Sequence, residues 1–589
     1  MADPGVEEPP DPKKERRNRI IKMVLHILFH IIFIAFFIWA AIIYLLFDQN
    51  EQRCIRPKPP EAENTTTTAA AAPGENPNPE EAAATTTTTT TSTTPAPEDK
   101  KLWKAHILCE FNWCIGFGFL VLMFVIFYIF WIYYWLFKPY IGQKLYDNKI
   151  EPIIDRWIEF SRRRVVSIIM LVAIIIIVGV YLGFECRDEA RKAVGITAPI
   201  IFILLGVGIS HSRRNIPWRI VVHGMLGQLI LGILCIRLQT GRDIFHCLGE
   251  KVTRFLRFTD HGARFVYGDR ICDEYVFAFA ILAVIFFFSV VTSVLYYLGV
   301  MQFILGAFGY LLQAMVGTTV CESVNAVGNV FLGMSESPLM IRPYIKVLTL
   351  SELHCICTLG YATVAGTVLG AYISFGASAA YLITASVMAA PGGLAYAKLF
   401  YPETEESQTK SDNIQLEKSE DHSILDAAAS GAANGLMIVL GIVSNIIAFL
   451  AIVYFFNAVT EWFFELAGKD GVTFLYLLTQ LFTPLAFIMG VPSYDCELVA
   501  RVVAEKTIIN EFVGYKSLGE LIKEKKIDQR SAGIATFALC GFANPGSLGI
   551  LIAALSAMAP TRRNDITQVA LRAFLTGSLV SFTSASIAG

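Results

Sequence analysis

The chain has 589 residues, of which 54% are hydrophobic and only 17% are charged, and its net charge is -2. Several apolar runs reach the roughly 20 residues that cross a bilayer as a helix, so the composition predicts an all-α polytopic membrane protein. The twelve cysteines form no CxxC pair or Cys/His cluster with metal-ligand spacing, which argues against a metal site of that kind. No nucleophile–base–orienter set is visible, so we do not expect an enzyme. The net charge by itself says little about partners, and we expect no nucleic-acid partner.

The N-terminal tail, residues 1–23, is rich in proline and charge and ends in a basic cluster that includes Arg16, Arg17 and Lys22. The apolar run at 24–47 is too long for the core of a signal peptide, so we expect a first transmembrane helix that stays in place. Basic residues beside a span favour the cytoplasmic side. We therefore place the N-terminus in the cytoplasm.

Residues 48–104 form a Thr-rich, low-complexity loop with many prolines. Such a segment cannot bury a core and is predicted to be disordered. Asn64 begins an N-glycosylation sequon, and a Thr/Pro tract is typical of O-glycosylation. An unmodified flexible linker is the alternative. Glycosylation would fit the extracellular side, to which the first span leads.

Additional N-terminal transmembrane helices are expected in residues 105–194, at 106–137 and 165–184. The cluster of arginines at 162–164 precedes the second of these and falls on the cytoplasmic side in this topology.

Residues 195–272 are predicted to hold scaffold helices at 195–210 and 219–236 and an amphipathic helix at 241–268. Apolar and basic residues occupy opposite faces of the last segment, which is typical of a helix lying along the membrane interface. Its basic residues would lie outside, in conflict with the charge rule. The apolar face comprises Ile244, Leu248, Val252 and Phe255, and the basic residues are Lys251, Arg254 and Arg257.

The stretch Gly317–Tyr344 is polar although long apolar segments flank it. Lipid offers no hydrogen-bond partners, so such backbone survives at membrane depth only inside protein or facing a wet cavity, and an acid there is a functional candidate. We predict a re-entrant hairpin whose tip lies near Asn329 to Glu336. Gly328, Gly333 and Pro338 are expected to interrupt any helix through it.

A second stretch, Gly490–Tyr515, repeats the pattern: Cys321 precedes Glu336 by 15 residues, and Cys496 precedes Glu511 by 15. Gly/Ala-rich polar segments follow both hairpins, at 361–372 and 540–550. Paired broken segments in corresponding halves of a chain indicate the binding site of a transporter. The predicted parts are a first repeat at 273–400, a cytoplasmic loop at 401–430 and a second repeat at 431–589.

The remaining spans are expected at 275–299, 350–373, 376–398, 433–457, 532–556 and 566–588, with a polar segment at 516–530. In total we predict about eleven transmembrane helices and two re-entrant hairpins in an inverted repeat. The C-terminus would then be extracellular.

The hairpin tips and broken helices offer two acids, Glu336 and Glu511, together with amide and hydroxyl groups and no Lys or Arg at the tips. Such a site would repel phosphates and carboxylates and suit a neutral, polyhydroxylated solute with a cation nearby, since carboxylates accept strong hydrogen bonds from hydroxyls. Glu322 and Glu497 are better explained as structural residues. Polar side chains in spans have helix packing as an equal alternative to a binding role, and the examples here are Asn325 and Asn445.

Several motifs resemble the concentrative nucleoside transporter family, most densely from about residue 217 to the end. The resemblance implies sodium-coupled uptake of nucleosides across the plasma membrane by a homotrimer that works as an elevator, with Na+ as the coupling ion. The motifs are GNVFLGMSESPLMIRPY from Gly328, SELH at 351–354, AGTVLGAYISFG at 365–376, SVMAAP at 386–391, YPETEES at 401–407, NEFVGY at 510–515 and CGFAN at 540–544.

The same resemblance implies two sets of binding residues. Ser335 stands where the family usually has Thr, and Pro545-Gly546 replaces bulkier residues before Ser547, which puts the local backbone in question. Phe542 would present an apolar face to the solute or belong to the core. The implied nucleoside-binding residues are Gly333, Met334, Ser335, Glu336, Thr367, Val368, Glu511, Phe542, Asn544 and Ser547; the implied sodium ligands are the Asn329 side chain, the Leu332 carbonyl, the Thr363 hydroxyl and the Val364 carbonyl.

Selectivity is expected to depend on residues beside the base. Gly333, Met334 and Thr367 resemble the purine-preferring pattern of the family. A glycine leaves room for a second ring, and a methionine offers a polarizable, adaptable surface. The alternatives are proton coupling, broad selectivity, a nucleoside-permeable channel and a nucleoside sensor.

Overall fold

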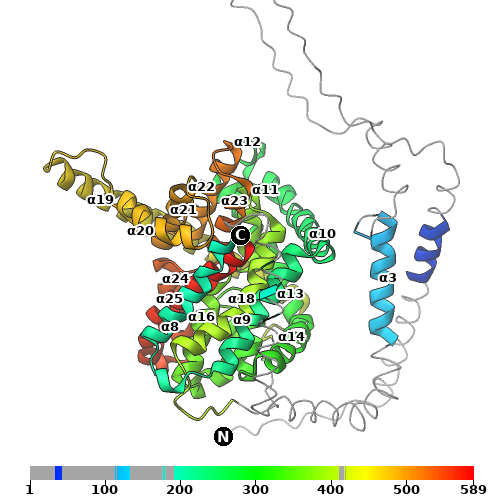
Figure 1. Ribbon diagram of the computed structural model, residues 1–589. Helices are drawn as coiled ribbons and strands as arrows, with labels where there is room; N and C mark the ends of the chain where they lie inside the picture. The colour runs from blue at the N-terminus through cyan, green and yellow to red at the C-terminus, as the bar shows by residue number, and fades with distance from the viewer. Residues whose placement is uncertain are drawn as a thin grey trace, which may run out of the picture. The chain divides into compact units, whose positions relative to one another are not determined.

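The computed structural model describes residues 33–42, 113–114, 116–132, 176, 179–180, 183, 192–409, 417 and 419–589. These residues are helical or irregular, with no strand among them, which confirms the all-α prediction. The chain divides into two compact units, Met1–Val172 and Ala173–Gly589. Figure 1 shows the helices of the second unit packed around one another.

In the first unit, a helix at Phe33–Ile42 lies within the predicted first span, and α3 (Gly116–Ile132) lies within the predicted span at 106–137. Both helices are rich in aromatic residues, and Phe37 stacks on Phe124 with 4.0 Å between ring centroids. The tail at 1–23, the loop at 48–104 with Asn64 and nearly all of the predicted span at 165–184 lie outside the described residues.

The second unit begins with apolar helices where two spans were predicted. They are α8 (Thr197–Ile209) and α9 (Trp218–Gly232), and α9 continues as a π-helical turn, Ile233–Arg237. Short helical turns, Lys192–Gly195 and Arg213–Asn215, precede these two helices.

The predicted amphipathic helix is divided into α10 (Gln239–Leu256) and α11 (Thr259–Tyr267), followed by the short α12 (Asp269–Asp273). α10 packs on α18 through its small residues: a Cβ on Gly249 would lie 2.9 Å from the Ala380 nitrogen. Ile244 and Leu248 remain about half exposed. The first half of the predicted apolar face is therefore free to contact lipid, whereas Val252 and Phe255 pack against the core of the protein.

The first repeat contains two helices that the sequence analysis did not separate correctly. α14 occupies 300–316, where no element was predicted, and α15 continues through Gly328 to Phe331, so that glycine does not interrupt the helix. The elements are η6 (Phe277–Ile281), α13 (Ala283–Tyr297), α14 (Val300–Val316), α15 (Val320–Phe331), η7 (Ser337–Val347), α16 (Leu350–Ala362), α17 (Gly366–Ser374) and α18 (Ala379–Phe400).

The second repeat also contains an unpredicted helix, α20, and α19 is far longer than the predicted span at 433–457. The polar segment at 516–530 is partly helical, because α22 extends to Lys523. The elements are α19 (Ile424–Glu465), α20 (Phe474–Ile488), α21 (Cys496–Ile508), α22 (Glu511–Lys523), α23 (Gln529–Leu539), α24 (Pro545–Met558), η8 (Pro560–Arg562) and α25 (Arg563–Ala588).

The order of elements repeats. Each half has a long apolar helix (α13 or α19), a second helix (α14 or α20), a helical hairpin (α15–η7 or α21–α22), a helix broken in the middle (α16–α17 or α23–α24) and a final long helix (α18 or α25). The two halves contact each other through α13 with α19 and through α18 with α25. The paired hairpins and broken segments of the sequence are thus matching parts of one body.

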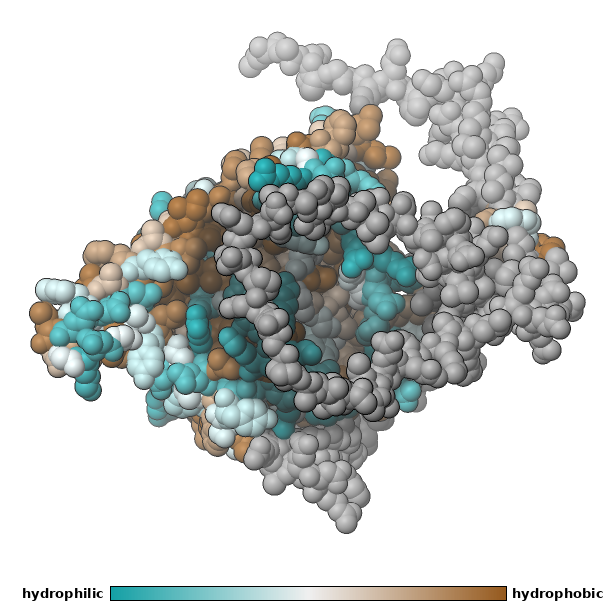
Figure 2. Space-filling view, turned by 90° about the horizontal axis from the view of Figure 1, so that it is seen from above, coloured by the Kyte–Doolittle hydropathy of each residue, from teal (hydrophilic) through white to brown (hydrophobic). Residues whose placement is uncertain are grey.

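Six helices among the described residues are long and apolar enough to cross a membrane, and six further apolar helices are shorter. Their surroundings differ sharply: the segment Leu350–Ser374 is 94% buried, whereas Ile424–Glu465 is 11% buried. The α16–α17 break therefore lies in the interior, and α19 presents apolar side chains outward. α19 and α20 extend from the side of the unit in Figure 1, and Figure 2 shows hydrophobic residues (brown) along the flank.

Candidate functional site

The first hairpin is held together at its arms by buried hydrogen bonds. The Ser337 hydroxyl lies 3.0 Å from both the backbone oxygen and the side-chain oxygen of Asn325. A Cβ on Gly328 would collide with that hydroxyl, so the glycine permits the close approach of α15 and η7. Asn325 accordingly serves the packing of the hairpin, one of the two roles left open for it.

At the tip of this hairpin, Glu336 folds back on its own loop. Its Oε2 accepts a hydrogen bond from the Gly333 backbone N–H at 3.1 Å. The side chain is half-buried and lines a cavity of about 300 Å³ with polar residues of α13 that include Ser289, Thr292 and Tyr296. Glu336 is thus a carboxylate with free acceptor capacity that faces a polar cavity. Ser335 beside it is also half-buried.

The two broken helices meet at their breaks. α16 ends at Thr363, whose backbone is extended, and the Thr363 carbonyl accepts a hydrogen bond from the Phe542 N–H at 3.2 Å. A Cβ on Gly541 would lie 2.6 Å from the Tyr361 carbonyl oxygen, so glycine is needed where the two chains cross. The crossing brings Thr363 and Phe542, predicted from separate repeats, into direct contact.

Glu511 lies beside this crossing and is 3% exposed. Its Oε2 accepts a hydrogen bond from Asn544 Nδ2 at 2.7 Å, and its Oε1 accepts one from the Tyr372 hydroxyl at 3.2 Å. It is also the first residue of α22, which Asn510 caps, and a carboxylate at a helix N-terminus is favoured by the helix dipole. Asn544 Oδ1 in turn accepts from the Ser547 N–H at 2.8 Å, where it caps α24.

The tip of the first hairpin packs on the same region. A Cβ on Gly333 would lie 3.3 Å from Ala365 Cβ, and one on Gly360 would lie 2.9 Å from Met334 Cβ. Met334 is consequently part of the buried core, and packing is a sufficient reason for glycine at 333. Among the described residues, no hydrogen bond joins Glu336 to Glu511.

Thr367 and Val368 lie in the first turn of α17 and are both buried. Val368 and Tyr372 are one helical turn apart and share a face. The structure therefore adds Tyr372 to the predicted site. Its position four residues after Val368 was the available sequence signal.

The predicted sodium ligands lie where two helices end. α15 ends with Leu332 at its C-cap, and α16 ends with Thr363 at its C-cap. Asn329 Nδ2 donates to the Asn325 carbonyl, whereas Asn329 Oδ1 is buried with no hydrogen-bond partner in the described part of the chain. Helix C-termini carry partial negative charge, and a hard cation prefers oxygen ligands. An unpaired buried acceptor at this place fits a cation.

The Thr363 hydroxyl donates to the Leu359 carbonyl at 3.1 Å and so keeps its lone pairs for another partner. Val364 is buried in the break that follows. These residues therefore offer a sodium ion neutral oxygen ligands only, with no carboxylate among them. The described residues contain no cluster of three or more His, Cys, Asp or Glu that could hold a metal ion.

Glu322 has a structural role, as preferred from the sequence. It forms a capping box with Thr319 at the start of α15, and its Oε1 lies 2.6 Å from the buried ammonium of Lys398. Glu497, at the corresponding place in the second hairpin, is exposed and accepts a weak hydrogen bond from Gln480 at 3.4 Å. Neither acid belongs to the site around the breaks.

One cation near the second tip was missed. Lys506 is fully buried near the end of α21, five residues before Glu511, and Glu511 and Cys540 are its ionisable neighbours. The expectation that no Lys or Arg lies at the tips therefore needs correction for the second hairpin. A lysine five residues before Glu511 was the available sequence signal.

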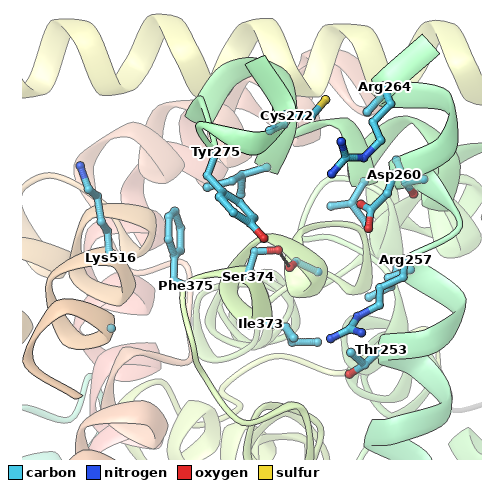
Figure 3. Close-up of a pocket in the computed structure, with 18 of the residues that line it drawn as sticks. Thr253, Arg257, Asp260, Arg264, Cys272, Tyr275, Ile373, Ser374, Phe375 and Lys516 are labelled. Carbon is cyan, nitrogen blue, oxygen red and sulfur yellow. Dashed lines mark hydrogen bonds between the residues drawn. The ribbon is translucent and has the colours of Figure 1, made fainter. Parts of the chain in front are cut away.

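A separate cavity of about 740 Å³ lies between α10–α12, α17 and α22. In Figure 3, Lys516 and Phe375 stand on one side of it, and Arg257, Asp260 and Arg264 stand on the other. It contains none of the predicted binding residues. Phe375 links it to the site through aromatic contacts, because Phe375 stacks on Phe277, which meets Phe512, next to Glu511, edge-to-face.

Three family descriptions match consecutive parts of the chain: "Na+ dependent nucleoside transporter N-terminus" at residues 197–270, "Nucleoside recognition" at 278–379 and "Na+ dependent nucleoside transporter C-terminus" at 381–589. The matched residues are those that form the second unit. They include both hairpins and both broken helices.

Curated relatives match over the same region. Solute carrier family 28 member 3 of Eptatretus stoutii is 43% identical over 420 residues, 68% of this chain and 61% of the relative. Sodium/nucleoside cotransporter 2 of Rattus norvegicus is 42% identical over 423 residues, 69% of this chain and 64% of the relative. The chain thus spans about six tenths of the length of these two relatives. Sodium/nucleoside cotransporter 1 of Oryctolagus cuniculus is 39% identical over 466 residues, 77% of this chain and 70% of the relative.

The chain is also similar to solved structures of transporters. The structure described as CNTnw in an inward-facing substrate-bound state is 36% identical, with a TM-score of 0.63 over 68% of this chain and 96% of that one. A doubly substituted CNTnw in an outward-facing state gives 35% identity and a TM-score of 0.64 over 68% of this chain and 97% of that one. Together with the paired hairpins and the crossing of the broken helices, these similarities show that the chain belongs to the concentrative nucleoside transporter family.

Proposed function

We propose that this protein takes up nucleosides across the plasma membrane, driven by the inward movement of sodium. The observation that carries the proposal is the environment of Glu511: a buried carboxylate that receives hydrogen bonds from Asn544 and Tyr372 at the crossing of two broken helices. A transporter of neutral solutes needs such an interior hydrogen-bonding site. The relatives' names, sodium/nucleoside cotransporter, supply the solute and the ion.

The acids would hold the sugar. Glu511 and Glu336 can accept hydrogen bonds from ribose hydroxyls, and these bonds are strong because the acceptor is charged. Asn544 orients the Glu511 carboxylate through its amide and caps α24 with its oxygen, so the acid is held in place before the solute arrives. Phe542 at the break would offer an apolar face to the base.

Sodium would be held by the Asn329 side chain, the Thr363 hydroxyl and the carbonyls of Leu332 and Val364. The same break carries the Thr363 carbonyl that binds Phe542, so the cation and solute sites share a backbone segment. Occupation of one site would thereby stabilise the backbone that forms the other. Such linkage is what couples two solutes in one transporter.

The membrane potential and the sodium gradient together supply enough free energy to accumulate nucleoside inside the cell. One charge moving across 100 mV contributes about 2.3 kcal/mol. A tenfold sodium gradient adds about 1.4 kcal/mol. One sodium ion per nucleoside at ordinary potentials therefore supports an accumulation on the order of several hundredfold.

The direct test is uptake of radiolabelled uridine by the full chain in proteoliposomes, with an inward gradient of sodium or of choline at constant pH. We expect uptake with sodium, stimulated by an interior-negative potential. Equal uptake in the two gradients would overturn the sodium assignment, and uptake that follows a proton gradient would replace it with proton coupling.

We further propose that the site prefers purine nucleosides. Gly333, Met334 and Thr367 match the purine-preferring pattern, and an apolar surface such as Met334 discriminates shape only weakly. Adenosine and guanosine should compete with uridine uptake at least tenfold better than cytidine does. Competition by cytidine as strong as that of the purines would contradict this selectivity.

The proposal extends to assembly and topology. We propose a homotrimer with re-entrant hairpins, an elevator motion, a cytoplasmic N-terminus and an extracellular C-terminus. The large apolar exposure of α19, with Met437, Tyr454 and Phe463 each more than half exposed, supports contact with lipid or a second copy. Cross-linking of the detergent-solubilised protein would give the number of subunits.

A further inference from the structure

Lys506 is a buried cation that the transport scheme above does not use. It lies in the last turn of α21 and is 0% exposed. Its ammonium has no hydrogen-bond partner among the described residues, and it stands 6.0 Å from the centroid of the Phe582 ring. Burying an ion without a close partner costs several kcal/mol. A residue kept at such a cost needs a physical reason.

The internal repeat supplies that reason through the register of the helix ends. The hairpin helices end with Leu332 and Ile509 at their C-caps, 177 positions apart (509 − 332). The broken helices end with Thr363 and Cys540 at theirs, again 177 positions apart (540 − 363). This offset aligns the helix ends and is two residues larger than that of the Cys321–Cys496 and Glu336–Glu511 pairs. In the register of the helix ends, Lys506 is the counterpart of Asn329.

The regions around Asn329 (the first place) and around Lys506 (the second place) are therefore built from the same elements, the ends of a hairpin helix and of a broken helix. Each lies three residues before the end of a hairpin helix. In the first repeat the partner end carries Thr363, and in the second it carries Cys540, an ionisable neighbour of Lys506. The C-cap of α21 lies three residues after Lys506, and α23, which contacts α21, has its C-cap at Cys540, the neighbour of Lys506. Two helix C-termini make each place electronegative.

The side chains complete the two places in opposite ways. Asn329 presents an unpaired buried acceptor, its Oδ1, to the first place. Lys506 presents an unpaired buried donor, its ammonium, to the second. The first place therefore requires a cation from solution, whereas the second already contains one that is covalently attached.

We propose that Lys506 is a tethered cation in the second repeat's counterpart of the sodium site, so that each protomer carries a single sodium ion with each nucleoside. The inference rests on the proposed sodium site at Asn329. Lys506 also supplies positive charge next to Glu511, which keeps that acid's charge compensated while no sodium occupies the second repeat. It is a positioning residue, because it acts on the solute through Glu511.

The test compares Lys506→Asn with Lys506→Arg and Lys506→Met. The ratio of charge moved to uridine taken up is measured under voltage clamp, and the number of 22Na ions bound per protomer is measured on the purified full chain. The wild type and Lys506→Arg should give one charge and one ion. Lys506→Asn, which places an Asn329-like ligand in the second repeat, should bind two ions, with the Hill coefficient for sodium rising from one toward two.

Lys506→Met removes the charge without adding an oxygen ligand, and it should reduce uptake while the number of bound ions stays at one. Two ions in the wild type would overturn the inference, as would wild-type uptake and affinity in Lys506→Met. If Lys506→Asn fails to fold, the comparison of uptake by Lys506→Met with uptake by Lys506→Arg still decides: loss in the first and retention in the second support the inference, and equal uptake overturns it. Sodium-independent uptake by the wild type would instead refute the proposed function itself.

Discussion

Replacing Glu511 with glutamine is expected to reduce nucleoside uptake by at least two orders of magnitude while the protein still folds and reaches the membrane. Glutamine keeps the volume but offers a neutral acceptor. Hydrogen bonds to charged groups contribute about 1.5–3 kcal/mol each, equivalent to about a 10- to 150-fold change in affinity. The buried carboxylate has no water to replace the bonds from Tyr372, Asn544 and ribose.

The matched control is Glu497→Gln, because Glu497 belongs to the same hairpin but is exposed and only weakly bonded. Uptake by this variant should remain near the wild-type rate. Surface biotinylation and gel filtration would establish that both variants are folded. Near-normal uptake in Glu511→Gln would show that the acid is structural.

Replacing Asn329 with alanine should raise the sodium concentration for half-maximal uptake about five- to tenfold, since it removes one neutral oxygen ligand worth on the order of 1–1.5 kcal/mol. The KM for nucleoside at saturating sodium should change less. The physical basis is the Asn329 Oδ1 atom, which is buried without a partner in the described part of the chain, near the end of α15. Sodium activation curves of uptake measure the effect.

Asn564→Ala is the corresponding control, because Asn564 is an exposed asparagine at the start of α25. Its sodium curve should match that of the wild type. An unchanged curve in Asn329→Ala would remove Asn329 from the sodium site. A variant that loses uptake at every sodium concentration, with reduced surface expression, would assign Asn329 to hairpin stability through its bond to the Asn325 carbonyl.

Local sequence determined the helical class and the location of the hairpins and of the helix breaks. Apolar runs longer than a bilayer crossing predicted membrane helices, and polar residues with glycine and proline inside such runs marked the hairpin tips and the breaks, because lipid satisfies no backbone group. The breaks at Thr363 and at Asn544 lie in the Gly/Ala-rich segments that the sequence singled out. The equal Cys–Glu spacing indicated the internal repeat, and the element order of the structure agrees with it.

Local sequence was a poor guide to helix boundaries. α14 and α20 went unpredicted because their 17 and 15 residues fall short of the roughly 20 that cross a bilayer as a helix. Gly328 was interpreted as a helix breaker, although it lies inside α15. Its actual role, to let Ser337 approach, depends on a side chain nine residues away and cannot be read from helix propensity.

Only the tertiary structure decided which polar groups meet. Tyr372 donates to Glu511 across 139 positions of sequence, and the Phe542 N–H reaches the Thr363 carbonyl from the other repeat. Lys398 pairs with Glu322, and Lys506 lies near Glu511, so the charges that matter inside the protein are set by packing. Hydropathy and spacing indicate whether a segment is buried, exposed or in lipid. They do not indicate the partner of a buried charge, because that partner is brought in by the fold that excludes water around the charge.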